Sequence, residues 1–280
     1  GAVMTCQECG FTFIPTILNN KAIISDVPVT GAYSEAIRTS QKLADVAGSW
    51  ELPIIDRKER EFPAMRDNTR RSIRRLGRYT QRGRILDFGC GAGFQLKVAC
   101  EEGWQGQGLE PLAAHAVYAR ARLGLPVVND VLHDETFPPE SFDAITAYQV
   151  FEHLPDPVQV IRQLIQALKP GGALLIEVPN IDNLLSRIMG PRHRHFVADH
   201  LNFFSSATLS KLMQDNGLKV VSVVYPSRTM SVEHLADWTN RLIPFAQPLV
   251  RLGHNPRLAH RKVSINLHDI IEVIGVKPPG

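Results

Sequence analysis

Three glycines at alternate positions, Gly89, Gly91 and Gly93, stand directly behind an apolar run that contains Asp87 near its end. Glycine tolerates backbone angles that other residues resist, and it lets a ligand lie directly against the peptide plane. A helix that begins after such a loop adds free N–H groups and the positive end of its dipole. The stretch therefore predicts a site for a small ligand that carries a carboxylate or a phosphate.

A second acidic residue, Glu110, ends the next apolar run, seventeen positions after Gly93. A carboxylate at a strand end can accept hydrogen bonds from both hydroxyls of a ribose, and such charge-assisted bonds contribute about 1.5–3 kcal/mol each. The spacing G-x-G-x-G differs from the G-x-G-x-x-G of dinucleotide-binding folds. Loop and acid together favour an adenosine-bearing cofactor; a tight turn without a ligand and a solvated strand-end glutamate are the alternatives.

Short apolar runs alternate with helical patterns over residues 81–228. We predict strands at 84–88, 107–110, 126–128, 142–149, 173–178, 218–225 and 268–276. We predict helices at 93–102, 113–123, 157–168 and 207–216. This alternation indicates an α/β fold with a doubly wound, seven-stranded, mostly parallel sheet, in which ligands bind beyond the carboxyl ends of the strands.

The chain divides into an N-terminal extension, residues 1–80, and a main domain, residues 81–280. An insertion at 229–266 precedes the last strand, and its segment 233–243 has helical spacing. We expect this insertion and the segment 180–205 to cover the carboxyl edge of the sheet and to choose the substrate, or to contact a second subunit in a homodimer.

The composition is that of an ordinary soluble protein, with 44% hydrophobic and 21% charged residues. A net charge of +3 is too small to indicate a nucleic-acid partner. No run approaches the ~20 apolar residues of a membrane span. The first thirty residues lack a signal-like apolar run, and the four cysteines do not form a secreted disulfide framework, so we expect a cytoplasmic protein.

Several stretches, in their order along the chain, resemble class I S-adenosylmethionine-dependent methyltransferases. They are Asp87-x-Gly-x-Gly-x-Gly93, Gly108-Leu-Glu-Pro111, Ser141-Phe-Asp-Ala-Ile145, Val150-Phe-Glu-His-Leu154 and Leu168-Lys-Pro-Gly-Gly172. Two more, Cys6-Gln-Glu-Cys-Gly10 and His200-Leu-Asn-Phe-Phe-Ser205, are similar to a small-molecule-type subgroup with an N-terminal cysteine knuckle. The resemblance covers roughly residues 82–225, and it implies a Rossmann-like methyltransferase fold, S-adenosylmethionine as cofactor and methyl transfer to a small-molecule acceptor.

The resemblance also implies a set of cofactor-binding residues. They are Asp87, Gly89, Cys90, Gly91, Gly93, Glu110, Pro111, Asp130, Val131 and Gln149. The loop and Asp87 would face the methionine part and its amino group, and Glu110 would hold the ribose. Asp130 would meet the adenine amino group with Val131 beside the ring, and Gln149 would line the methionine part. The cysteine within the loop is better interpreted as a small packed residue.

Methyl transfer from a sulfonium is an in-line displacement whose leaving thioether is neutral, so alignment, which can supply ~7–11 kcal/mol, is the main requirement. A base is needed only when the acceptor is a hydroxyl, an ammonium or an acidic C–H. We predict His153 and His200 as candidate bases. The alternatives are a histidine bonded to nearby backbone and a segment that merely caps the following helix at Ser205 or Ser206. Whether oxygen, nitrogen or carbon receives the methyl group is left open.

Two metal sites are conceivable from the sequence. Cys6 and Cys9 have the spacing of half a tetrahedral zinc knuckle, but Cys90 and Cys100 belong to the core and cannot supply the second pair. One interpretation is therefore that Cys6 and Cys9 bind zinc, and the other is that they are the remainder of a decayed or incomplete site. A site made of His193, His195 and His200 lacks an evident fourth ligand.

A basic helix is predicted before the first strand. Its arginines are Arg70, Arg71, Arg74, Arg75 and Arg78. We interpret them as a solvated face, or as a site for an anionic acceptor; RNA fits poorly because no aromatic residues are interleaved. Two further functions stay as alternatives: a non-catalytic adaptor that keeps the cofactor fold, and an NAD-dependent oxidoreductase, which would require the missing G-x-G-x-x-G.

Overall fold

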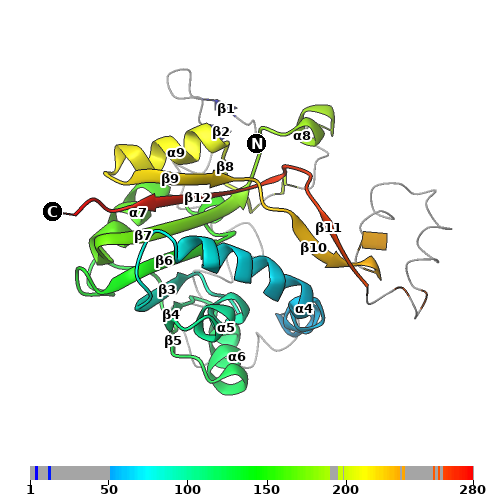
Figure 1. Ribbon diagram of the computed structural model, residues 1–280, viewed down its shortest axis with the longest axis horizontal. Helices are drawn as coiled ribbons and strands as arrows, with labels where there is room; N and C mark the ends of the chain where they lie inside the picture. Colours follow the sequence, from blue (N-terminus) through cyan, green and yellow to red (C-terminus); the bar gives the residue numbers. More distant parts are fainter. Residues whose placement is uncertain are drawn as a thin grey trace, which may run out of the picture.

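The computed structural model in Figure 1 describes residues 4–5, 12–13, 51–189, 195–197, 199–233, 235–236, 255, 258 and 261–279. Cys6, Cys9 and His193 lie outside the described residues, so the predicted zinc sites that use them stay predictions. Within the described ranges, no helix combines the length and the apolar character that crossing a membrane requires.

A seven-stranded sheet forms the centre of the molecule, in the order β5-β4-β3-β6-β7-β12-β9. Its strands are β3 Arg84–Phe88, β4 Gln105–Leu109, β5 Val127–Val128, β6 Phe142–Tyr148, β7 Leu168–Pro179, β9 Lys219–Val224 and β12 Ile270–Val276. Neighbours from β5 to β7 pair in parallel, whereas β12 is antiparallel to both β7 and β9. The predicted mostly parallel sheet is confirmed, and the last strand of the chain lies inside it.

Helices cover both faces of this sheet (Figure 1). They are α4 Glu51–Leu76, α5 Phe94–Glu101 and α6 Ala113–Leu123 on one face, and α7 Pro157–Ala167 and α9 Ser206–Asp215 on the other. Successive residues of a strand point to opposite faces. Ile85 of β3 therefore packs in one core cluster with Ile73 of α4, and Leu86 packs in another with Ile161 of α7.

Short elements at the carboxyl edge of the sheet carry the segments that follow the strands. They are η2 Phe151–His153, a 3₁₀ turn after β6, α8 Leu184–Met189 after β7 and β8 Asn202–Phe203. Helix α9 begins with a capping box, in which the Thr208 N–H donates to the Ser205 hydroxyl at 3.2 Å and the Ser205 N–H donates to the Thr208 hydroxyl at 2.9 Å. Ser205 is thus the cap expected for the segment that follows His200.

Several arginines of α4 form ion pairs with acids elsewhere in the chain. Nε of Arg70 and Nε of Arg74 donate to the carboxylate of Glu102 at 2.7 and 2.8 Å. Arg75 pairs with Glu272 of β12, which is fully buried. These contacts tie the helix to the end of α5 and to the sheet, so they do not support the interpretation of this face as a site for an anionic acceptor.

Two small sheets lie beside the central one. One is an antiparallel ribbon that projects from the main body (Figure 1), made of β10 Arg228–Ser231 and β11 Lys262–Ile265. The predicted insertion at 229–266 therefore starts and ends as strand, and helix is described only at 232–233 and 235–236. The other small sheet joins β1 Met4–Thr5 and β2 Thr12–Phe13 to β8.

Candidate functional site

The glycine loop joins β3 to α5 at the carboxyl edge of the sheet. Gly89, Gly91 and Gly93 have φ angles of 69°, 55° and 83°, in the left-handed region that glycine adopts without strain. A Cβ on Gly89 would lie 2.6 Å from the Cγ2 atom of Val150, so this position admits no side chain. A Cβ on Gly91 would instead lie 3.5 Å from Nζ of Lys58, a residue of α4. The loop thus packs closely on the turn after β6 and faces a lysine of the N-terminal helix.

Glu110, directly after β4, reaches back to this loop. Its carboxylate accepts the N–H of Gly91 at 2.7 Å and the N–H of Leu112 at 2.9 Å, and the residue is only 4% exposed. Burial raises the pKa of the Glu110 carboxyl, and the two N–H donors oppose that rise. An ionised carboxylate has lone pairs for about four hydrogen bonds, so two further donors can be accommodated. The structure therefore brings together the acid and the loop that the sequence singled out.

Asp87, in β3, lies beneath the loop and is 2% exposed. One carboxyl oxygen accepts the hydroxyl of Thr146 at 2.8 Å, and the other has no hydrogen-bond partner among the described residues. Burial raises the pKa of Asp87 to about 7, although the Thr146 bond opposes it. A cationic group placed against this carboxyl would favour its ionised form.

Lys58 was not identified from the sequence. Its position places an ammonium group over the glycine loop, and burial lowers the pKa of Lys58 while the charge of Glu110 opposes that shift. The residue lies 29 positions before Asp87, in a helix whose pattern gave no sign that it would fold back over the loop. No local signal could have revealed this contact, because it depends on how α4 packs against the sheet.

The end of β5 lies beside the end of β4. The amide of Asn129 donates to the carbonyl oxygens of Glu110 at 2.8 Å and of Pro111 at 3.0 Å, which ties the two strand ends together. Asp130 follows, with an exposed carboxylate that accepts the N–H of Val131 at 2.8 Å. The residues predicted to meet the adenine thus stand at the same edge as the predicted ribose acid.

Two other predicted cofactor residues face protein atoms. Cys90 is 5% exposed, its sulfur would lie 2.6 Å from a Cβ on Gly108, and burial raises the pKa of its thiol. This agrees with its interpretation as a small packed residue. Gln149 adopts a left-handed φ of 56°, and its amide donates to the carboxylate of Glu177 at 3.3 Å. Strained backbone of this kind concentrates at functional sites.

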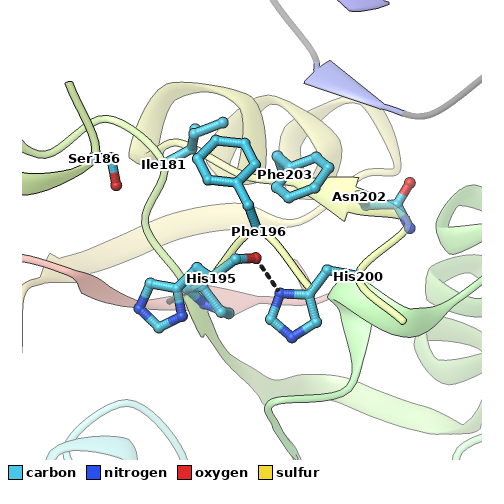
Figure 2. A pocket seen from close by; sticks show the side chains of 8 residues that line it. Ile181, Ser186, His195, Phe196, His200, Asn202 and Phe203 are labelled. Atoms are coloured by element: carbon cyan, nitrogen blue, oxygen red, sulfur yellow. Dashed lines mark hydrogen bonds between the residues drawn. The ribbon is translucent and has the colours of Figure 1, made fainter. Parts of the chain in front are cut away.

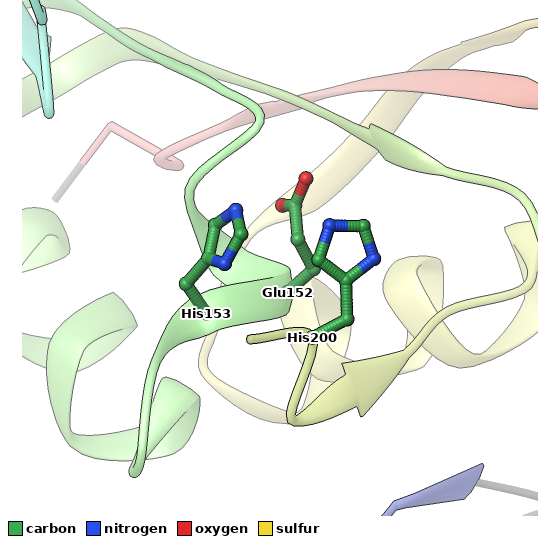
Figure 3. A group of neighbouring side chains, drawn as sticks. All are labelled: Glu152, His153 and His200. Atoms are coloured by element: carbon green, nitrogen blue, oxygen red, sulfur yellow. The ribbon is translucent and has the colours of Figure 1, made fainter. Parts of the chain in front are cut away.

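A cluster of one carboxylate and two imidazoles follows β6 (Figure 3). Glu152 and His153 come from η2, His200 comes from the segment before β8, and one ligand atom from each lies within 4.8 Å of the others. Nδ1 of His153 lies 2.9 Å from the carbonyl oxygen of Asp199, and Nδ1 of His200 lies 2.8 Å from that of His195. Because a carbonyl only accepts, both Nδ1 atoms carry the proton and both Nε2 atoms keep a lone pair.

Glu152 is the unusual member of the cluster. It is 1% exposed, and within the described part of the chain neither carboxyl oxygen has a hydrogen-bond partner. Burial raises the pKa of Glu152 to about 8, and burial followed by the charge of His153 lowers the pKa of His200 to about 4. Glu152 belongs to the sequence motif Val150–Leu154, but only His153 of that motif was predicted to have a role. The signal in the sequence was the position of this acid within an apolar stretch, directly after Phe151 and two residues before Leu154.

A small pocket adjoins the cluster (Figure 2). Its apolar wall contains Ile181, Phe196 and Phe203, and the two phenyl rings stack with centroids 5.1 Å apart. His195 and His200 line its polar side, linked by the hydrogen bond drawn as a dashed line in Figure 2. The pocket therefore joins an apolar wall to an imidazole of the cluster, and its free space is only about that of one water molecule.

The chain is similar to known proteins in both sequence and structure. A family model described as a methyltransferase domain matches residues 58–223. A ubiquinone biosynthesis O-methyltransferase of Aliivibrio fischeri is 30% identical over 153 residues, which cover 49% of this chain and 64% of the relative. A relative of the same name from Aeromonas salmonicida is 29% identical over 175 residues, which cover 56% of this chain and 69% of the relative. The chain thus spans just under two thirds of the Aliivibrio protein.

Solved structures agree on the fold. A SAM-dependent methyltransferase of Thermotoga maritima, described as a possible histamine N-methyltransferase, has a TM-score of 0.55 at 18% identity, over 81% of this chain and 96% of that chain. A SAM-dependent methyltransferase of Archaeoglobus fulgidus has a TM-score of 0.53 at 19% identity, over 80% and 99%. These likenesses confirm the predicted Rossmann-like methyltransferase fold. Because the family model matches more than half of its length, the chain belongs to the methyltransferase domain family.

Proposed function

We propose that this chain transfers a methyl group from S-adenosylmethionine to a hydroxyl oxygen of a small, flat, apolar acceptor. The observation that carries the proposal is the glycine loop joined to Glu110, whose buried carboxylate lies 2.7 Å from the N–H of Gly91. A site built this way has bare main chain for the methionine part and an acid for a ribose. The name of the Aliivibrio relative, an O-methyltransferase, agrees with oxygen as the acceptor atom.

The cofactor's charged groups have complements around the loop. Its ribose would take the remaining lone pairs of Glu110, and its adenine amino group would meet Asp130. Its ammonium would pair with the unsatisfied oxygen of Asp87, and its carboxylate would pair with the ammonium of Lys58, which stands over Gly91. The ammonium and the carboxylate of the methionine part would thereby each meet an opposite charge, and the partner of the ammonium, Asp87, is buried, where such pairs contribute most.

The acceptor ring would lie against the apolar wall of the pocket in Figure 2, with its hydroxyl toward the cluster, and this narrow pocket would have to widen to admit it. His153, whose Nδ1 proton is directed to the carbonyl oxygen of Asp199, would act as the base through its Nε2 lone pair. His200, whose pKa is lowered to about 4, holds a proton poorly and would orient the hydroxyl. Nε2 of His153 would take the hydroxyl proton as the oxygen attacks the methyl carbon. The C–S electron pair stays on sulfur, and a neutral thioether leaves.

Two measurements test the proposal. Calorimetry should give a micromolar Kd for S-adenosylmethionine, about −8 kcal/mol. With methyl-labelled cofactor, label should enter an extractable product from phenolic acceptors such as catechols, but not from analogues whose hydroxyls are already methylated. Cofactor binding without transfer to any member of a broad acceptor panel would favour the non-catalytic adaptor. Absence of cofactor binding would refute the proposal, and NADH binding in a fluorescence titration would favour the oxidoreductase.

A further inference from the structure

We propose that Glu152, His153 and His200 form a binding site for a divalent transition-metal ion, with zinc as its best-suited occupant. One carboxylate and two imidazoles are a donor set that such ions accept, with coordination positions left open for other ligands. The three donor atoms already lie within 4.8 Å of one another. Around an ion with bonds of about 2.0–2.2 Å they would stand roughly 3.5 Å apart, so binding would draw the side chains together by about an ångström.

Glu152 provides the independent observation. A carboxyl group that is 1% exposed, with no hydrogen-bond partner for either oxygen in the described part of the chain, carries a large desolvation cost. Protonation would remove the charge but would satisfy at most one of the two oxygens, through the lone pair of a neighbouring imidazole. Figure 3 shows the carboxylate directed toward the two imidazole rings. A cation between these groups would satisfy it.

The histidines are oriented as metal ligands usually are. A ligating histidine typically donates its other ring N–H to a carbonyl or carboxylate, which fixes the ring and leaves the ligand nitrogen unprotonated. Here the Nδ1 atoms of His153 and His200 face the carbonyl oxygens of Asp199 and His195 at 2.9 and 2.8 Å. Both Nε2 lone pairs are thereby available to the same ion.

The backbone holds the two halves of the cluster in place. The N–H of Leu201 donates to the carbonyl of Glu152 at 2.7 Å. The amide of Asn202 donates to the carbonyls of Phe151 at 3.2 Å and Leu154 at 2.6 Å. The residues next to His200 are therefore fastened to both sides of the turn that carries Glu152 and His153. Such preorganisation lowers the cost of assembling a metal site.

The role of the ion rests on the proposed function. An ion held here would occupy the lone pair of His153, so it would replace this residue as the group that activates the acceptor. A hydroxyl coordinated to the ion has a lowered pKa, releases its proton to water, and presents an oxygen lone pair to the methyl carbon. The C–S pair again leaves on sulfur, so no redox step or further reactant is involved.

The test uses the full chain with Cys6→Ser and Cys9→Ser, so that no metal can bind at the cysteine pair. After removal of metal with a chelator, Zn²⁺ and Co²⁺ are titrated in the absence of S-adenosylmethionine. We expect one equivalent to bind, and the visible absorption of bound Co²⁺ to report a low-coordinate site. Glu152→Gln should weaken the Zn²⁺ affinity at least tenfold and His200→Ala should abolish stoichiometric binding, whereas His133→Gln, an exposed histidine outside the cluster, should leave it unchanged.

Circular dichroism and thermal melting must show that the variants fold; if His200→Ala does not, the isosteric Glu152→Gln carries the test. No stoichiometric binding to the parent chain, or equal binding by a folded Glu152→Gln, would overturn the inference. Metal binding without methyl transfer would support the metal site and contradict the proposed function. If methyl transfer proceeds unchanged in a chain shown to hold no metal, the proposed role of the ion is wrong and the proposed function is supported.

Discussion

Replacement of Glu110 by alanine tests the cofactor site most directly. In the structure its carboxylate is 4% exposed and already accepts two backbone N–H groups, from Gly91 at 2.7 Å and Leu112 at 2.9 Å. The proposed complex adds two ribose hydroxyls to the same carboxylate. The substitution therefore removes both ribose contacts and also releases the N–H of the glycine loop from its acceptor.

The expected loss follows from these contacts. Hydrogen bonds to a charged group contribute about 1.5–3 kcal/mol each, so the loss of one ribose bond alone weakens binding about tenfold, and the loss of both weakens it roughly a hundredfold or more. A micromolar Kd should accordingly become sub-millimolar at best. The unpaired N–H groups should also lower the free energy of unfolding by about 1–3 kcal/mol, unless water enters the space.

Calorimetry with S-adenosylmethionine, performed well below the melting temperature of both proteins, separates the two effects. Glu140→Ala is the matched control, since it makes the same substitution at an exposed acid outside the site. Glu110→Gln keeps the shape and one acceptor oxygen, and its affinity should fall between those of wild type and Glu110→Ala. An unchanged Kd in a folded Glu110→Ala variant would remove this residue from the ribose site and with it the main support for the cofactor assignment.

Three further outcomes are expected. Lys58→Met should weaken S-adenosylmethionine binding several-fold without lowering the melting temperature, because it removes the ammonium over Gly91 but keeps an apolar stem; equal affinity would exclude the proposed carboxylate contact. Cofactor binding at pH 7 should release up to about half a proton, seen as a buffer-dependent calorimetric enthalpy, since the pKa of Asp87 is about 7 and a bound ammonium favours its ionised form; Asp87→Asn should lose this release. His115 is buried, and burial lowers its pKa to about 4. As the pH falls below about 6.5, the imidazole therefore takes up a proton in the unfolded chain but not in the native state. The free energy of unfolding should accordingly decrease by about 3 kcal/mol by pH 4. In urea unfolding between pH 6.5 and 4, the free energy of unfolding of His115→Gln should decrease less than that of the wild type. An equal decrease in both proteins would contradict this assignment.

The arrangement of the residues in the proposed cofactor site could be predicted because its signals are local. Strand 84–88 and helix 113–123 were predicted with the bounds that the structure has, and the glycine loop follows the first of them directly. Glu110 was recognised as a strand-end acid from its own neighbourhood. In a parallel sheet, strand ends on one edge converge, so residues placed at such ends meet without further information.

Contacts between distant segments could not be predicted in this way. The apolar pattern of β12 shows that it is buried, but not that it lies between β7 and β9. Lys58 reaches the loop only because α4 packs across the sheet. The two histidines were singled out separately, yet their meeting depends on the Leu201–Glu152 hydrogen bond between segments almost fifty residues apart.

The buried acids of this chain differ in the partners that they meet. Glu177 and Glu272 are as inaccessible as the acids of the site, but each meets an arginine, Arg228 at 2.8 Å and Arg75 respectively. Asp87 and Glu152 form no ion pair among the described residues. One oxygen of Asp87 and both oxygens of Glu152 also lack a hydrogen-bond partner there, whereas Glu272, which has one such oxygen, is balanced by the charge of Arg75. Folding alone gives no reason to bury such groups, because their desolvation is then uncompensated. Both lie at the carboxyl edge of the sheet, where the missing partner of Asp87 would be the cofactor's ammonium and that of Glu152 a metal ion. Each ligand should therefore stabilise the fold independently. At a hundred times its Kd, S-adenosylmethionine would add about 2.7 kcal/mol to the free energy of unfolding, and Asp87→Asn should reduce that gain while leaving the gain from Zn²⁺ intact.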